Sequence, residues 1–268
     1  MTRRLAILAG SGALPVLLAD TAPGAYCVTF AGVPHELRCV THQFHFEKLG
    51  ELFGALKAEG VTEVVFAGSM SRPPLDPAAF DLVMLGLAPR LMTAMQGGDD
   101  ALLRLVITIF EEQGFTVRGA HEIAPQLTVS EGIFCGSGPS EQALQDADRA
   151  ADILNALAPV DVGQGCVVAG GLCLGIETIQ GTDALLGFVA GTPKHLRRNA
   201  KGVFVKALKR GQDLRIDMPA IGPETVKNAA TAGVEGIVLQ AGGVLILDRH
   251  ATKHAAEQAG IFIMGRAL

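Results

Sequence analysis

Short apolar runs and stretches of helical spacing alternate along the first half of the chain. Between residues 46 and 59, apolar residues recur every three or four positions and Gly60 ends the pattern, as in an amphipathic helix. Alternating strands and helices indicate a parallel sheet with right-handed crossover connections. The predicted strands are Leu5–Ala9, Tyr26–Phe30 and Val61–Ala67, and the predicted helices are Leu14–Ala19, Phe46–Glu59 and Asp99–Gln113.

This alternation is interrupted between residues 125 and 139, where glycines and prolines occur with little periodicity. We interpret 125–139 as a linker between an N-terminal domain, 1–124, and a C-terminal domain, 140–268. The predicted fold class is α/β, with an N-terminal Rossmann-like parallel sheet and a C-terminal mixed α/β domain. In the second half, strands are expected at Cys166–Ala169, Leu172–Thr178, Gly202–Ala207, Gly236–Gln240, Val244–Leu247 and Ile261–Met264, and helices at Glu141–Leu157, Thr182–Val189, Pro223–Ala232 and Ala251–Ala259.

The composition indicates a folded protein that does not bind nucleic acid. Hydrophobic residues make up 49% of the 268 positions and charged residues 18%, so a large core is available and disorder is excluded. The net charge is −5, Trp is absent and Tyr occurs once. The chain therefore lacks both the basic surface and the stacking rings that nucleic acid requires.

The sequence also favours a cytoplasmic protein. The first apolar run is broken by Gly10 and Gly12, which favours a buried strand over a signal peptide. No window approaches the roughly eighteen apolar residues of a membrane span. Five scattered cysteines without a CxxC pair fit neither a disulfide framework nor a zinc site, so a reducing compartment is expected.

Two glycine-rich segments follow predicted strands, where parallel sheets bind ligands. Gly10-Ser11-Gly12-Ala13 opens a helix, so it is either a tight structural turn or a contact for a nucleotide or sugar phosphate. A third glycine and an acidic residue after the second strand are missing, which argues against NAD. The second segment is Gly68-Ser69-Met70-Ser71-Arg72-Pro73, in which Arg72 either pairs with a phosphate or is solvated.

Two helix starts carry polar residues with two readings each. Asp99 and Asp100 follow Gly97-Gly98 and either cap a helix or, together with phosphate oxygens, hold Mg²⁺. Thr182 and Asp183 likewise either cap a helix or bind an anion and hydroxyl groups.

Residues 212–219 predict a strand with a charged face. With a period of two, Asp213, Arg215 and Asp217 share that face. Pro219 and Pro223 then close the chain into a rigid turn, which fixes Asp217 at the end of the strand. The charged face is either that of a solvated edge strand or part of a site, in which the fixed carboxylate holds a metal or orients a water.

Seven short motifs occur in order along the chain: AGSGALP at 9–15, FAGSMSRP at 66–73, GDDALLR at 98–104, GAHE at 119–122, DVGQG at 161–165, ETIQGTDALL at 177–186 and QDLRIDMPAIGPETV at 212–226. Together they resemble the UDP-2,3-diacylglucosamine pyrophosphatases of the LpxI type. Met218 and Ala220 replace the Leu and Thr of the family pattern, and Gln180 stands where many relatives carry Glu.

The resemblance implies hydrolysis of the diphosphate of UDP-2,3-diacylglucosamine to UMP and 2,3-diacylglucosamine 1-phosphate in lipid A synthesis. It further implies a homodimer, Mg²⁺ as cofactor, a catalytic C-terminal domain and Asp217 as the catalytic residue. We expect Mg²⁺ at Asp217 with Asp99 or Asp100. Substrate contacts are expected from Ser11, Gly12, Ala13, Gly68, Ser69, Met70, Arg72, Thr182, Asp183, Lys206, Gln212 and Arg215.

Two questions stay open at this level. The apolar, Met-rich stretch from Leu82 to Met95 is either buried core or dimer interface, or it is a wall for the acyl chains, with peripheral contact of the protein at the inner membrane. The alternative function is a non-catalytic nucleotide-sugar sensor or lipid carrier. Pure binding has no need of Asp217 or of the Asp99–Asp100 pair, which favours the enzyme.

Overall fold

The computed structural model describes residues 4–70, 74–160, 162–209 and 211–268, and the chain divides into two compact units. The first unit contains the chain up to Pro125 together with Asp213–Asp217. The second contains Gln126–Gln212 and Met218–Leu268. The predicted two-domain α/β class is confirmed, but five residues from late in the sequence belong to the N-terminal unit.

The first unit is built on a parallel sheet of five strands in the order β3-β2-β1-β4-β5. The order 3-2-1-4-5 matches the first five positions of the dinucleotide-binding sheet, whose full order is 3-2-1-4-5-6. The three predicted strands are confirmed, and two short strands at the sheet edges were missed. The strands are β1 (Leu5–Ala9), β2 (Tyr26–Phe30), β3 (Thr41–Phe44), β4 (Glu63–Ala67) and β5 (Thr116–Arg118).

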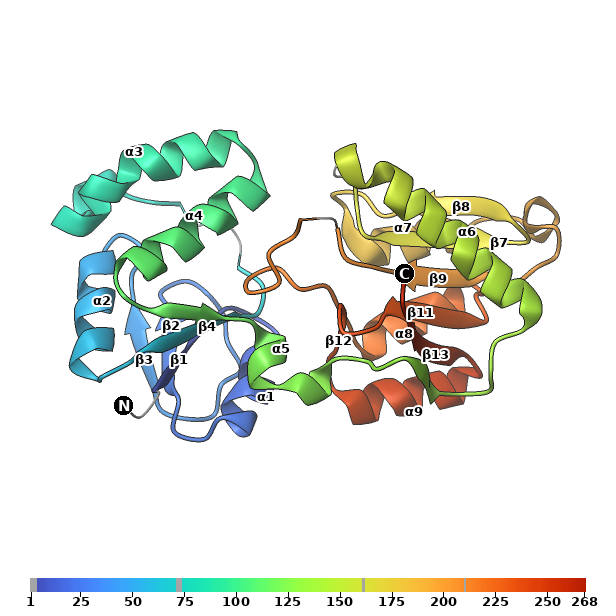
Figure 1. Ribbon diagram of the computed structural model, residues 1–268, viewed down its shortest axis with the longest axis horizontal. Helices are drawn as coiled ribbons and strands as arrows, with labels where there is room; N and C mark the ends of the chain where they lie inside the picture. The colour runs from blue at the N-terminus through green and yellow to red at the C-terminus, as the bar shows by residue number, and fades with distance from the viewer. Residues whose placement is uncertain (1–3, 71–73, 161, 210) are drawn as a thin grey trace. The chain divides into compact units, whose positions relative to one another are not determined.

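Helices cover this sheet as the apolar pattern requires (Figure 1). On one face, α2 (Leu49–Ala58) and α4 (Asp99–Glu112) contribute Leu52, Phe53 and Phe110 to a core shared with Leu8 of β1. The short helix α5 (Ala120–Ile123) packs beside α1 (Leu14–Thr21), and both contact β4.

The Met-rich stretch forms α3 (Leu82–Gln96), which packs against α2 and α4. Met84 is its buried residue, and Leu87 and Leu91 lie against the core. Leu82 is 87% exposed and Met92 65% exposed. The buried-core reading is therefore wrong for most of this stretch, because only one side of the helix meets the unit.

The second unit is built on a mixed sheet of six strands in the order β6-β13-β11-β9-β7-β8, in which β9, β11 and β13 run parallel. The predicted glycine-linked hairpin is present as the antiparallel pair β7–β8. The strands are β6 (Gly132–Cys135), β7 (Gly165–Ala169), β8 (Leu172–Ile176), β9 (Val203–Lys206), β11 (Gly236–Gln240) and β13 (Phe262–Arg266); a separate parallel pair is β10 (Ala220–Ile221) with β12 (Leu245–Ile246).

Both faces of this sheet are buried, and alternate residues of its strands belong to different clusters. Val168, Val205 and Val238 share a cluster with the alanines of α6, whereas Val167 and Phe204 pack with α7, α8 and α9. Runs such as GCVVA, apolar on both faces, are what this arrangement requires. The helices of this unit are α6 (Glu141–Leu157), α7 (Gly181–Ala190), α8 (Pro223–Thr231) and α9 (Arg249–Ala259).

Short 3₁₀ turns occur in both units. They are η1 (Pro77–Ala79), η2 (Pro125–Leu127), η3 (Ala158–Val160) and η4 (Lys194–Arg197).

Two expectations about the second half are wrong. The segment 125–139 is not simply a linker, because β6 within it pairs antiparallel with β13. Residues 212–219 contain no strand; the chain turns there instead. Within the described residues, no helix is both long and apolar enough to cross a bilayer.

Candidate active site

The two glycine-rich loops meet at the carboxyl ends of β1 and β4. The Ser11 and Ser69 backbones bridge each other: Ser11 N–H donates to the Ser69 carbonyl at 2.8 Å, and Ser69 N–H donates to the Ser11 carbonyl at 3.0 Å. The Ser11 hydroxyl donates to the same Ser69 carbonyl at 3.0 Å. These groups hold the two loops together, and their contact with substrate stays a prediction.

Glycine is required where the loops cross. A Cβ atom on Gly10 would lie 2.4 Å from the Ser69 carbonyl oxygen, and one on Gly68 would lie 2.4 Å from the Ser11 carbonyl oxygen. Gly68 also has a φ of +90°, which disfavours any other residue. The structural-turn reading therefore accounts for Gly10, Gly68 and Ser69.

Gly12 differs from these glycines. It has a φ of +91°, and a Cβ there would meet no atom within 4 Å. Gly12 and Ala13 lead into α1, and Met70 is 38% exposed in the other loop. Gly12, Ala13 and Met70 thus remain candidates for ligand contact, whereas the prediction for Arg72 falls outside the described residues.

The segment that carries Asp217 is a single tight turn. The backbone N–H groups of Ile216 and Asp217 both donate to the Asp213 carbonyl, at 3.2 Å each. Ile216 packs against the core of the first unit, and Asp217 is exposed at the end of the turn. The prediction of a fixed Asp217 agrees with this arrangement, although the fixing element is a turn and not a strand.

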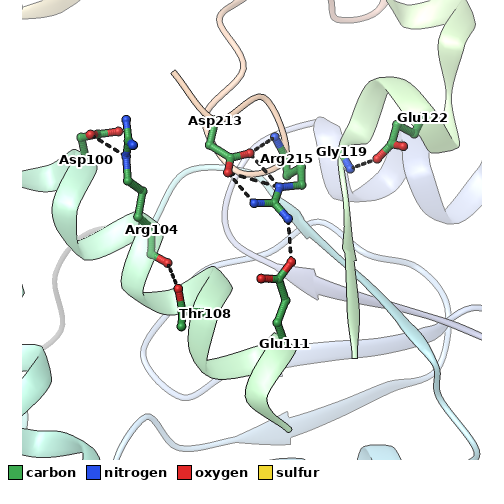
Figure 2. Close-up of polar contacts among 8 residues, drawn as sticks. All are labelled: Asp100, Arg104, Thr108, Glu111, Gly119, Glu122, Asp213 and Arg215. Carbon is green, nitrogen blue, oxygen red and sulfur yellow. Dashed lines mark hydrogen bonds and ion pairs between the residues drawn. The ribbon is translucent and has the colours of Figure 1, made fainter. Parts of the chain in front are cut away.

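Arg215 holds this turn on α4 (Figure 2). Its Nε and Nη2 donate to the Asp213 carboxylate at 2.9 Å and 2.6 Å, and its Nη1 donates to Glu111 Oε1 at 2.7 Å. These bonds raise the pKa of the Arg215 guanidinium, and the hydrogen bond from Arg215 lowers the pKa of Asp213. In this geometry two carboxylates contact the Arg215 guanidinium, and its role as a phosphate ligand stays a prediction.

Glu111 and Asp213 were not predicted to act in the site. The sequence did offer a signal for Asp213, because it stands two residues before Arg215. A turn brings side chains at that spacing together. Glu111 lies 104 positions from Arg215 in the sequence, so no local pattern pointed to their contact.

Among the side chains that the structure describes, the start of α4 forms no ready metal site. The Asp100 carboxylate accepts from Arg104 Nε at 2.9 Å, one helical turn away on the exposed surface (Figure 2). The Asp99 side chain falls outside the description. Among the described residues, no group of three His, Cys, Asp or Glu side chains is placed to hold a metal. The residues described thus form no preformed Mg²⁺ cage, and the predicted role of Asp100 at Mg²⁺ stays a prediction.

The second unit contains a buried ion pair at the start of α7. Lys206 Nζ lies 2.6 Å from the Thr182 hydroxyl and 3.3 Å from Glu177 Oε2. The Thr182 hydroxyl donates to Glu177 Oε1 at 3.1 Å. Lys206 and Thr182, both predicted to contact substrate, are therefore brought together around a carboxylate of the protein.

Glu177 was missed, although a lysine at the end of a buried strand requires a buried partner. Two glycines make room for it: a Cβ on Gly165 would lie 2.4 Å from Glu177 Oε2, and a Cβ on Gly163 would overlap its backbone. The remaining candidates have nearby partners. Asp183 accepts from Asn228 at 2.8 Å, and Gln212 Oε1 accepts from the Lys209 N–H at 3.2 Å.

The fold and these sites define a two-domain α/β protein, with glycine loops at the carboxyl edge of a parallel sheet and an exposed carboxylate, fixed by a turn, in the same unit. Comparison with known proteins gives the family. Residues 4–127 match the LpxI N-terminal domain and residues 130–264 match the LpxI C-terminal domain. The chain belongs to the LpxI family.

A similar curated protein is the UDP-2,3-diacylglucosamine pyrophosphatase LpxI of Caulobacter vibrioides. It is 40% identical over 273 aligned residues, which cover 98% of this chain and 97% of that protein. The family predicted from the seven motifs is confirmed.

Proposed function

We propose that this protein hydrolyses the diphosphate of UDP-2,3-diacylglucosamine, releasing UMP and 2,3-diacylglucosamine 1-phosphate for lipid A synthesis. The observation that carries the proposal is its 40% identity, over nearly the full length of both chains, to a protein named for this activity. The fixed turn that presents Asp217 is a physical reason to expect an enzyme and not a carrier, because a binding protein does not require a rigidly held carboxylate.

In this proposal Asp217 orients the attacking water and accepts its proton. A carboxylate can do this only if its position is held, and the Arg215 contacts to Asp213 and Glu111 fix the turn on α4. Phosphorus attack also requires donors to the phosphate oxygens. Gly12 and Ala13 at the start of α1 are the candidates for this role in the first unit.

Mg²⁺ belongs to the proposal through the resemblance alone. When bound, Mg²⁺ neutralises charge on phosphate oxygens. The described carboxylates do not form a cage for it, and Asp100 is paired with Arg104. Because Mg²⁺ commonly binds through one or two carboxylates plus substrate phosphates, we expect it to arrive with the diphosphate.

A homodimer and peripheral contact with a membrane are also part of the proposal. The exposed apolar residues of α3, among them Leu82, Leu85 and Met92, are compatible with either an interface or acyl-chain contact. With α3 in contact with acyl chains, the protein would act on the cytoplasmic side of the inner membrane.

The proposal is tested by following UMP release from UDP-2,3-diacylglucosamine by phosphorus NMR in ¹⁸O-labelled water. Wild-type protein is expected to release UMP, and the labelled product identifies the phosphorus attacked. Asp217→Asn keeps the shape of the side chain and is expected to lower kcat by roughly 10²–10⁴-fold, the usual range for loss of a general base. Tight binding by the wild type without turnover would establish the sensor or carrier reading instead.

A further inference from the structure

Two cysteines that the proposed hydrolysis does not use lie together on the β7–β8 hairpin. The Sγ atoms of Cys166 and Cys173 are 3.9 Å apart. Cys173 is the cross-strand neighbour of Val168, and Cys166 precedes Val168 by two residues on the same face of β7. The two thiols are therefore diagonal neighbours on one face of the hairpin.

The two thiols have different surroundings. Cys166 is fully buried in the cluster beneath α6, whereas Cys173 is exposed on β8, the last strand of the sheet. The hydrogen bond from the Cys166 thiol lowers the pKa of Cys173 to about 6, and the positive charge of Arg149 acts in the same direction. The same interaction, together with burial, raises the pKa of Cys166. The thiolate is thus favoured at the exposed sulfur and the thiol at the buried one.

A second cysteine pair shows that proximity alone does not produce this arrangement. Cys27 and Cys39 have their sulfurs 3.3 Å apart, closer than the hairpin pair. Burial and the contact with Cys39 raise the pKa of Cys27 to about 12. That pair joins a strand to a loop, and it serves as an internal comparison.

We propose that Cys166 and Cys173 form a reversible redox-modification site that reacts with hydroperoxides. The Cys173 thiolate attacks one peroxide oxygen, the O–O bond breaks, and the leaving hydroxide or alkoxide takes a proton from water. The Cys166 sulfur then attacks the resulting sulfenic acid. The S–O bond breaks, hydroxide leaves with the Cys166 proton as water, and an S–S bond forms. Two thiols lose two electrons to the peroxide, and a dithiol reductant restores them.

The position of the pair suits a reversible bond. The sulfurs must close from 3.9 Å to about 2.05 Å, the length of a disulfide. Because β8 has a paired strand on one side only, it can shift without breaking a second ladder. Low pKa, exposure and an adjacent second thiol are also the properties that distinguish redox-sensitive cysteines from inert buried ones.

The full chain, prepared reduced, is treated with hydrogen peroxide at pH 7, alkylated, digested with trypsin and analysed by mass spectrometry. The tryptic peptide 150–194 contains Cys166 and Cys173 and no other cysteine. We expect this peptide to become resistant to alkylation and lighter by two hydrogens, and to regain both thiols after dithiothreitol. Cys173 should react about tenfold faster than N-acetylcysteine, because its lowered pKa favours the thiolate. Full alkylation of both residues after peroxide would overturn the proposal.

Matched variants separate the two roles. In Cys166→Ala, Cys173 should accumulate as a sulfenic acid that dimedone traps, and its alkylation midpoint should rise from near 6 toward about 8.5, the value of an ordinary thiol. Cys39→Ser should leave hairpin oxidation unchanged. Thermal melts of each variant verify folding. A Cys166→Ala protein with the alkylation midpoint and the oxidation product of the wild type would contradict the assigned pairing.

Discussion

At the residue scale, the clamp around Arg215 sets where Asp217 lies. The guanidinium bridges Asp213 and Glu111, all three are partly exposed, and exposed ion pairs contribute only about 0–1 kcal/mol to stability. We therefore expect Glu111→Gln to reduce kcat about tenfold while changing the free energy of unfolding by less than about 1 kcal/mol. Kinetics and urea unfolding on the same preparations measure both. The matched control is Glu112→Gln, which lies on the same helix as Glu111 and breaks the ion pair with Arg90 of α3; it should retain full turnover.

The buried pair of the second unit should behave in the opposite way. Lys206 and Glu177 have side chains 5% and 9% exposed, so removing one partner leaves a charge buried without compensation. Glu177→Gln is expected to cost about 3–5 kcal/mol, and the double variant Glu177→Gln/Lys206→Met should recover part of that loss. Urea unfolding of the singles and the double gives the coupling energy. Additive losses in the double variant would show that the pair is not coupled.

At the element scale, the strands and helices with strong apolar periodicity were predictable and those without it were not. The strand β3 has the sequence THQF and lies at the sheet edge, and β5 is three residues long, so neither carried a usable pattern. The charged alternation of Asp213, Arg215 and Asp217 was read as one strand face. In the structure it produces a turn, because Arg215 can fold back onto Asp213 two residues away.

The candidate site was predictable in its residue types but not in its contacts. Asp217 and the glycine loops could be found from motif and position. That Ser11 bonds to Ser69, and Lys206 to Glu177, depends on tertiary packing that local sequence does not encode. The contacts that sequence could not reveal are therefore those between a predicted ligand and a protein partner distant in sequence.

The helix α3 provides a direct test of one-sided burial. Met84 is 2% exposed, whereas Leu85, its neighbour in sequence, is 52% exposed. We expect Met84→Ala to cost about 2–5 kcal/mol of stability and Leu85→Gln to change it by less than about 0.5 kcal/mol. Urea unfolding of the two variants makes the comparison. Equal losses would mean that the outer side of α3 is covered in solution, and size-exclusion chromatography would then identify a dimer.

At the scale of the whole molecule, the family domains and the compact units do not coincide. The segment Asp213–Asp217 falls within the matched C-terminal domain, yet it belongs to the N-terminal unit, where Ile216 packs on the core. The residue proposed for catalysis is thus supplied by one half of the sequence and held by the other. Turnover should therefore require the continuous chain.

The metal requirement also concerns the whole molecule, because Mg²⁺ binds either to the free protein or only together with the substrate. EDTA is expected to stop UMP release and added Mg²⁺ to restore it. Since the described residues form no three-ligand site, millimolar Mg²⁺ alone should shift Tm by less than about 1 °C, as a ligand stabilises a protein only when its concentration exceeds Kd. Differential scanning fluorimetry with Mg²⁺, with UMP and with both measures this. A large shift with Mg²⁺ alone would demonstrate a preformed cation site and contradict delivery with the diphosphate, whereas turnover that survives EDTA would remove the metal from the reaction.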